Sequence, residues 1–174
     1  MNLSPEEVRY CCRCATALSM RHVAGRPRPA CPACGYIHFN EPKVGVGLLL
    51  LDARGRLLLV RRGVPPAEGL WALPAGFVDG GEDPARAAVR ETHEETGLKA
   101  EVTGLVDVYH NPPARAGATI FILYRGRITG GRLAAADDAL EAGFFEPDAL
   151  PELAFASTRD AVRRLRDGRP APGR

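Results

Sequence analysis

Three glutamates within five residues could bind a metal ion. Glu91, Glu94 and Glu95 stand at positions i, i+3 and i+4, which fall on one side of an α-helix. Carboxylates at this spacing weaken an isolated helix by roughly 0.2–0.5 kcal/mol per pair unless a positive group lies between them. Mg²⁺ prefers oxygen ligands and is commonly shared between a few carboxylates and substrate phosphates. A solvated acidic helix face is the ordinary alternative for such spacing.

The flanking residues indicate the element that would position these acids. Asp83 can cap the free N–H groups of a helix, Pro84 suits its first turn, and Gly97 supplies a left-handed stop. A neighbouring stripe that can face a core consists of Ala85, Ala88, Val89 and Thr92. The sequence therefore predicts a short helix between Asp83 and Gly97, held in place by packing.

The wider pattern around the acids resembles the Nudix box. The motif G-x5-E-x7-R-E-x2-E-E-x-G-L is matched by Gly76, Glu82, Arg90, Glu91, Glu94, Glu95, Gly97 and Leu98. Thr92 departs mildly from it, because the family usually has an aliphatic residue there. Outside the box, the segments 71–76 and 153–155 and the pair Arg61-Arg62 are similar to the Nudix group that carries an N-terminal zinc ribbon.

This resemblance implies an α/β fold, the Nudix α/β/α sandwich with a mixed sheet, and Mg²⁺ or Mn²⁺ at the box. Glu91 and Glu95 would be the main metal ligands, Glu94 a ligand or the base that activates water, and the Gly76 carbonyl a further ligand. Arg90 would orient the acids through ion pairs, while the glutamate of the preceding loop would brace that loop. Hydrolysis of a pyrophosphate needs a water molecule made more acidic, groups that hold the phosphate oxygens, and neutralisation of the charge on the leaving phosphate. Bound cations can supply all three.

Five residues outside the box are candidates for contact with substrate or metal. Arg61 and Arg62 could each donate paired hydrogen bonds to a phosphate, although adjacent strand residues point to opposite faces. Trp71 and His110 could stack on a ring or bond phosphate, with core packing as the alternative for an aromatic residue. Glu141 begins a predicted strand where Nudix enzymes often carry another acid, and there it could bind Mg²⁺ or simply be solvated.

Four cysteines form a second pattern. Cys11-x2-Cys14 and Cys31-x2-Cys34 are separated by sixteen residues, which is the spacing of a zinc ribbon. A tetrahedral thiolate site favours Zn²⁺, and metal binding would fold a segment too small to build its own core. Disulfides or free thiols are the alternative, and Cys12 is left over as a bystander.

We expect three regions: a leader with the zinc ribbon over 1–39, a Nudix domain over 40–168, and a flexible tail over 169–174. In the second region, 43–51 and 56–61 are expected to form a hairpin, and 110–117 a loop. Further strands are predicted over 101–109, 119–127 and 141–145, and Ser157 could cap a last helix that runs to about Asp167.

Composition limits the classes of function. The 174 residues are 45% apolar, enough for a core, and none of the apolar runs reaches the length of a membrane span. The net charge of +2 does not argue for nucleic acid as a partner. The opening MNLSPEEVRY has no apolar run of the kind a signal peptide needs, so we expect a reducing cytoplasm.

Taken with the resemblance, these features predict a Mg²⁺-dependent hydrolase of the pyrophosphate in an ADP-linked compound, ADP-ribose first and FAD next. The products would be AMP and a phosphorylated partner. The S-Q-P-W-P-F-P-x-S signature of NADH pyrophosphatases does not occur here, which counts against NADH as the main substrate. We expect the zinc ribbon to be structural, bracing the domain or a homodimer interface.

Two other hypotheses for the function stay open. One is a nucleic-acid- or ligand-binding regulator, since arginines lie near the cysteines, although no aromatic-rich stacking series accompanies them. The other is a housecleaning hydrolase of NADH, nucleoside triphosphates or capped RNA, because substrate choice lies in loops that the box does not encode.

Overall fold

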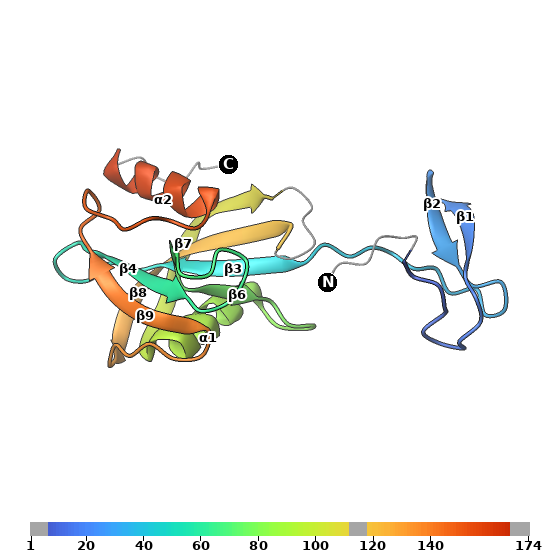
Figure 1. Cartoon of the computed structure of the whole chain (residues 1–174), viewed down its shortest axis with the longest axis horizontal. Coiled ribbons are helices and arrows are strands. Elements are labelled where there is room, and N and C mark those ends of the chain that lie inside the picture. The colour runs from blue at the N-terminus through green and yellow to red at the C-terminus, as the bar shows by residue number, and fades with distance from the viewer. Residues whose placement is uncertain (1–6, 112–117, 168–174) are drawn as a thin grey trace. The chain divides into compact units, whose positions relative to one another are not determined.

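The computed structural model describes residues 7–111 and 118–167 (Figure 1). The chain divides into two compact units, Met1–Pro42 and Lys43–Arg174, called here the N-terminal and C-terminal units. The tail predicted over 169–174 and most of the loop predicted over 110–117 lie outside the described residues.

The N-terminal unit is a hairpin flanked by two similar turns. Its strands β1 (Ser19–Val23) and β2 (Arg26–Ala30) pair antiparallel. In one turn the N–H of Ala15 donates to Cys11 O at 2.8 Å, and in the other the N–H of Gly35 donates to Cys31 O at 3.1 Å. Both turns end in the left-handed region, with φ of 57° at Ala15 and 73° at Gly35. Each turn therefore brings the two cysteines of one pair to the same side of the chain.

The C-terminal unit contains two sheets. The first has the order β6-β3-β8-β7, and the second has the order β5-β4-β9. The strands of the first are β3 (Val44–Leu49), β6 (Ala75–Phe77), β7 (Leu98–His110) and β8 (Ile120–Gly131). Those of the second are β4 (Leu57–Arg62), β5 (Trp71–Ala72) and β9 (Ala139–Phe145). The pair β3–β8 is parallel and the other pairs are antiparallel, so the first sheet is mixed.

The predicted hairpin of 43–51 and 56–61 forms only at its turn. There the N–H of Leu58 donates to Leu50 O and the N–H of Asp52 to Arg56 O, both at 3.0 Å. Beyond the turn β3 joins the first sheet and β4 the second. The hairpin expected around this turn therefore does not extend along the strands, because both are buried over most of their length and each pairs with neighbours in its own sheet.

Two helices cover opposite sides of these sheets, α1 (Pro84–Thr96) and α2 (Ala156–Arg166) (Figure 1). Leu48 and Leu50 belong to the core cluster that includes Ala87 and Ala88 of α1. Leu49, which lies between those two leucines, belongs to the cluster that includes Ala161 and Val162 of α2. Because neighbouring strand residues alternate in direction, one strand serves both cores. The α/β/α sandwich is confirmed.

Helix α1 begins and ends as predicted. One carboxylate oxygen of Asp83 accepts from the N–H groups of Ala85 and Arg86, each at 3.0 Å. Gly97 has φ of 69°, and its N–H donates to His93 O at 2.8 Å. Both ends of the helix that carries the acids are thus fixed by local hydrogen bonds.

Helix α2 differs from the expectation at its start. Phe155 occupies the cap position and has no side-chain capping bond, while Ser157 lies buried inside the first turn. The first helical hydrogen bond runs from the N–H of Arg159 to Phe155 O at 3.1 Å. Ser157 as the cap was therefore wrong, because packing of the 153–155 segment beside Trp71 starts the helix earlier.

Among the described residues, neither helix has the length and apolar character needed to cross a membrane.

Candidate active site

Arg90 connects several carboxylates of the box through hydrogen bonds. Its Nε and Nη2 donate to the two carboxylate oxygens of Glu82 at 2.8 and 2.9 Å. Its Nη1 donates to Glu91 Oε1 at 2.8 Å and to Glu94 Oε2 at 2.9 Å, and Nη2 also reaches Phe77 O at 3.0 Å. One guanidinium thus holds three carboxylates of the box and ties the helix to the strand before it.

These contacts shift the ionisation of the partners. Hydrogen bonds from Arg90 lower the pKa of Glu82 to about 2, and the N–H of Asp79 adds to that effect. In return, Glu82 raises the pKa of Arg90 above its already high value. Both groups are therefore charged at every pH at which the protein would work.

Glu95 is buried. Only 5% of the residue is exposed, and its Oε2 accepts from the N–H of Ala75 at 2.9 Å. Burial raises the pKa of Glu95 to about 8. Burial also raises the pKa of Glu91, although Arg90 partly opposes this. Both carboxylates lie near β6 and have lost much of their contact with water. A cation bound between them would stabilise their charged forms.

Gly76 lies against the carboxylate of Glu91. A Cβ placed on Gly76 would sit 2.0–2.2 Å from the carboxylate atoms of Glu91. A side chain at this position would push the Glu91 carboxylate away from the place where Arg90 holds it. The glycine of the box therefore permits a close approach of strand backbone and acid.

The acids fit a divalent cation. Within the described chain, the cysteines form the one group of three or more potential ligands that converge within 4.8 Å of one another. The glutamates do not converge that closely, and Arg90 lies between Glu91 and Glu94. The fit rests on the buried carboxylates of Glu91 and Glu95 beside Gly76, since oxygen ligands with excess negative charge suit Mg²⁺ or Mn²⁺.

Two candidates outside the box contact each other. Arg61 Nη1 donates to Glu141 Oε1 at 2.7 Å, and the two residues are opposed in the β4–β9 register. The Nε of Arg61 also donates to Gly69 O at 3.0 Å. Both side chains are about half exposed, with 43% and 55% of their surface accessible. The structure therefore presents them as one exposed ion pair.

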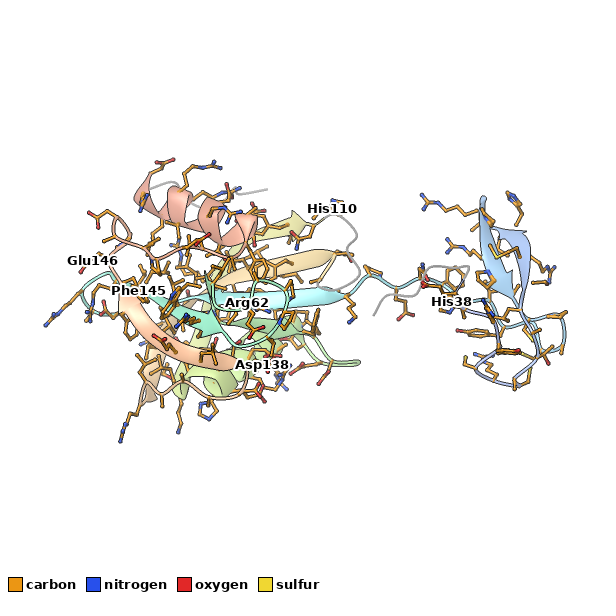
Figure 2. The ribbon with its side chains drawn as sticks, in the orientation of Figure 1. His38, Arg62, His110, Asp138, Phe145 and Glu146 are labelled. Carbon is orange, nitrogen blue, oxygen red and sulfur yellow. The ribbon has the colours of Figure 1, made fainter. Side chains whose placement is uncertain are left out.

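Arg62 is more enclosed. Its Nε donates to Pro66 O at 2.8 Å and its guanidinium lies over the ring of Phe155, 5.1 Å from the centroid. Burial lowers the pKa of Arg62, while the charges of Glu95 and Asp138 oppose this shift. Figure 2 labels Arg62 and Asp138 on the C-terminal unit. The adjacent strand residues Arg61 and Arg62 thus have different surroundings, as the alternation of a strand requires.

Asp138 was not singled out from the sequence. It precedes β9, and its carbonyl accepts from the N–H of Gly63 at 2.7 Å. Its charge acts on Glu95 as well as on Arg62. The signal available in the sequence was the adjacent pair Asp137-Asp138, but only the fold shows that the charge of Asp138 reaches Arg62 and Glu95.

Trp71 and His110 differ in their surroundings. Trp71 packs edge-on against Phe145, with ring centroids 4.7 Å apart, and borders the core cluster on the α2 side. His110 was expected in a loop but is the last residue of β7, where it is exposed. Among the described residues, none of the hydrogen bonds or ion pairs involves the side chain of His110.

The N-terminal unit holds a second site. The sulfur atoms of Cys11, Cys14, Cys31 and Cys34 lie within 4.8 Å of one another. Backbone N–H groups of Arg13 and Cys34 point at the sulfurs of Cys11 and Cys31, at 3.4 and 3.5 Å. All these cysteines are free thiols, and Cys12 is exposed outside the cluster. The group could hold a tetrahedral metal ion such as Zn²⁺.

Comparisons with known proteins agree with this geometry. The NUDIX domain family model matches residues 41–165. An ADP-ribose pyrophosphatase of Methanocaldococcus jannaschii is 43% identical over 122 residues, 69% of this chain and 69% of that protein. The NAD-capped RNA hydrolase NudC of Chromobacterium violaceum is 32% identical over 166 residues, 91% of this chain and 60% of that protein.

A solved structure agrees as well. The crystal structure of a NUDIX hydrolase from Nitrosomonas europaea superposes with a TM-score of 0.82 and 29% identity, covering 94% of this chain and 96% of that one. The family match spans more than half of the chain and includes every residue of the box. The chain therefore belongs to the Nudix hydrolase family.

Proposed function

We propose that the protein hydrolyses the pyrophosphate of an ADP-linked compound, ADP-ribose first and FAD next, to AMP and a phosphorylated partner. The observation that carries the proposal is the set of carboxylates held by Arg90, with Glu95 buried against β6. The Methanocaldococcus relative named an ADP-ribose pyrophosphatase supports the substrate, since it matches this chain at 43% identity.

Each residue of the site has a role in this proposal. Glu91 and Glu95 would hold Mg²⁺ or Mn²⁺, with the Gly76 carbonyl as a further ligand. Glu94 is the most exposed of the three acids, with 43% of its side chain accessible, and it serves as a ligand or accepts the proton of the attacking water. A bound divalent ion acidifies water and neutralises charge on the phosphates. Arg90 keeps the carboxylates in place.

The exposed pair contributes to binding. Arg61 can turn from Glu141 to a phosphate oxygen, because both side chains reach solvent and an exposed pair of this kind is worth little on its own. Glu141, once released, would offer a further carboxylate oxygen to the cation. Arg62, tied to Pro66 O and near Glu95, supplies a fixed positive charge beside the site. Trp71 supports this region through packing, and His110 is free to contact the substrate.

Substrate assays with a matched variant test the proposal. The purified chain is incubated with Mg²⁺ and ADP-ribose, FAD, NADH, a diadenosine polyphosphate or a nucleoside triphosphate, and the products are identified by chromatography. We expect AMP from the ADP-linked compounds and its loss in Glu94→Gln. The control is Glu101→Gln, which removes an exposed acid paired with Arg127 away from the box. Absence of turnover with both Mg²⁺ and Mn²⁺ would contradict the proposal.

A second candidate is hydrolysis of a nucleotide cap on RNA. The NudC relative matches 91% of this chain, so its similarity extends into the N-terminal unit. A short RNA that carries a 5′ NAD cap belongs in the same assay. Faster release of its cap than turnover of ADP-ribose at equal concentration would make capped RNA the better substrate.

For the four thiols we propose a structural Zn²⁺. Their convergence within 4.8 Å supports this role. Metal analysis of the purified protein should give one zinc per chain.

A further inference from the structure

The hairpin of the N-terminal unit has a basic face that the hydrolase chemistry does not use. Strands β1 and β2 carry Arg21, Arg26 and Arg28, and residues 19–30 include no acid. Arg21 and Arg28 are directly opposed in the antiparallel register. Opposed residues share a face, and like charges at that spacing destabilise a sheet. The arrangement therefore favours an anionic partner.

The guanidinium groups of this face have no acidic partner among the described residues. Within the described chain, none of these three arginines takes part in a salt bridge or a side-chain hydrogen bond, and the Nε of Arg28 is buried with no acceptor. By contrast, Arg56, Arg90 and several other arginines of the C-terminal unit are paired with acids. The side chains of Arg21 and Arg26 are exposed and their donors remain free for a ligand, and Arg28 can offer only the part of its guanidinium that reaches the surface.

An aromatic ring completes the face. After the last cysteine the chain runs beside β2, where Ala30 bridges Ile37 and the N–H of His38 donates to Pro29 O at 2.8 Å. His38 is labelled in this segment in Figure 2. The pairing brings Phe39 next to Arg28, whose guanidinium lies 4.5 Å from the ring centroid. Phe39 is 49% exposed, so part of its ring is open to solvent.

We propose that Arg21, Arg28 and Phe39, here called the Arg–Phe face, bind single-stranded nucleic acid. The two arginines contact phosphates, for which a planar guanidinium is well suited. The exposed ring stacks on an unpaired base, and such stacking needs a strand whose bases are free. An acidic peptide would satisfy the charges but would leave the ring without a planar partner. The hairpin register places Arg28 opposite Arg21, and the segment after the last cysteine places Phe39 beside Arg28.

Binding can be measured without any hydrolysis. The probe is a 20-nucleotide RNA with a 5′-hydroxyl and a 3′ fluorophore, which contains no pyrophosphate bond, and the readout is fluorescence anisotropy with the full chain over a range of salt. Failure of binding and failure of the proposed hydrolysis are therefore independent. We expect Arg21→Ala/Arg28→Ala to weaken binding at least tenfold and to reduce the slope of log Kd against log salt by about 1.4, since each phosphate contact on a single strand contributes about 0.7.

Matched variants separate the Arg–Phe face from net charge. Arg125→Ala/Arg127→Ala removes the same charge from exposed positions on the C-terminal unit and should leave binding within about twofold. Phe39→Leu keeps an apolar side chain and should weaken binding about tenfold, given the usual size of base stacking. Zinc content is measured for each variant, because retained zinc shows that the unit is folded.

Three results would overturn the proposal. The first is an equal loss of binding in the two double arginine variants. The second is unchanged binding in both Arg21→Ala/Arg28→Ala and Phe39→Leu with zinc retained. The third is competition by poly-glutamate or by duplex DNA as effective as competition by unlabelled single-stranded RNA.

Discussion

At the scale of single residues, the box is organised by one arginine and one glycine. Arg90 binds three glutamates, and Gly76 lets the strand backbone approach Glu91. The chemistry therefore depends on a few atoms whose neighbours fix their positions. Substitutions that keep shape but remove charge test this arrangement most directly.

Glu95→Gln should abolish turnover while the fold is retained. The amide oxygen can still accept from the N–H of Ala75, which Glu95 contacts at 2.9 Å, but it carries no charge for a cation. We expect a loss of about 10²–10⁴-fold in kcat, the range usual for the loss of an essential catalytic group. Steady-state kinetics and circular dichroism measure the two effects. A variant with near-normal kcat would show that Glu95 is not a metal ligand.

Gly76→Ala should lower activity more than stability. Its Cβ would fall 2.0–2.2 Å from the Glu91 carboxylate, so that side chain must turn away from Arg90, which costs little stability but misplaces an acid of the site. A misplacement of about 1 Å in a site can lower kcat by about 10²-fold. Gly80→Ala is the matched control, because a Cβ there meets nothing within 4 Å. Urea denaturation and the assay with ADP-ribose are the measurements. Equal behaviour of the two variants would contradict the close approach.

At the scale of elements, the acids depend on the ends of α1 and on the loop before it. Asp83 fixes the start of the helix, Gly97 its end, and Glu82 links the loop to Arg90. These are local interactions, so their energies can be measured one at a time. The core strands on either side then fix the direction in which the helix points.

Asp83→Ala should destabilise the C-terminal unit by about 1 kcal/mol, the usual cost of losing a side-chain cap. Two N–H groups, those of Ala85 and Arg86, lose their acceptor. Ser157→Ala should cost less, because Ser157 lies inside the first turn of α2 and caps nothing. Urea denaturation followed by Trp71 fluorescence compares the two variants. A larger effect at Ser157 would restore its role as a cap.

Glu82 should contribute to stability in a defined range of pH. Its pKa in the folded chain is about 2, below the ordinary value of 4.5, chiefly because Arg90 donates to it. A lowered pKa means that the stabilisation is present above about pH 4.5 and is lost as the pH falls towards 2. Glu82→Gln should flatten the dependence of unfolding free energy on pH in that window. An unchanged slope would show that Arg90 does not stabilise the ionised form.

At the scale of the whole molecule, the chain consists of two compact units that differ in what can hold them together. The N-terminal unit is small and has a cysteine cluster, while the C-terminal unit has two core clusters around its sheets. Trp71 is the only tryptophan of the chain, so its fluorescence reports on the C-terminal unit alone.

Removal of zinc should unfold the N-terminal unit and leave the intrinsic chemistry largely intact. A unit of this size folds with its metal and has little core without it. With a zinc-selective chelator and excess Mg²⁺, we expect loss of structure by circular dichroism, unchanged Trp71 fluorescence and less than about a threefold change in kcat. Parallel loss of zinc and of kcat at constant Mg²⁺ would assign the thiols a part in catalysis.

The sequence by itself determined the parts of the protein that depend on local spacing. The box, helix α1 with its two ends, and the two cysteine pairs are set within short segments by helix geometry, capping and turn formation. The sandwich could be predicted through the resemblance of those same segments to a family. The strands β3, β4, β7, β8 and β9 could also be placed, apart from shifts of a few residues at their ends, whereas β1, β2, β5 and β6 were not predicted.

Only the tertiary structure decided which distant residues meet. It divided the expected hairpin between two sheets, joined Arg61 to Glu141, brought the charge of Asp138 within range of Arg62 and Glu95, and put Phe39 against Arg28. These contacts link positions far apart in sequence, and they follow from strand pairing and from the burial of two cores. Local patterns do not contain that information, because the free energy of such contacts depends on register and packing across the whole unit.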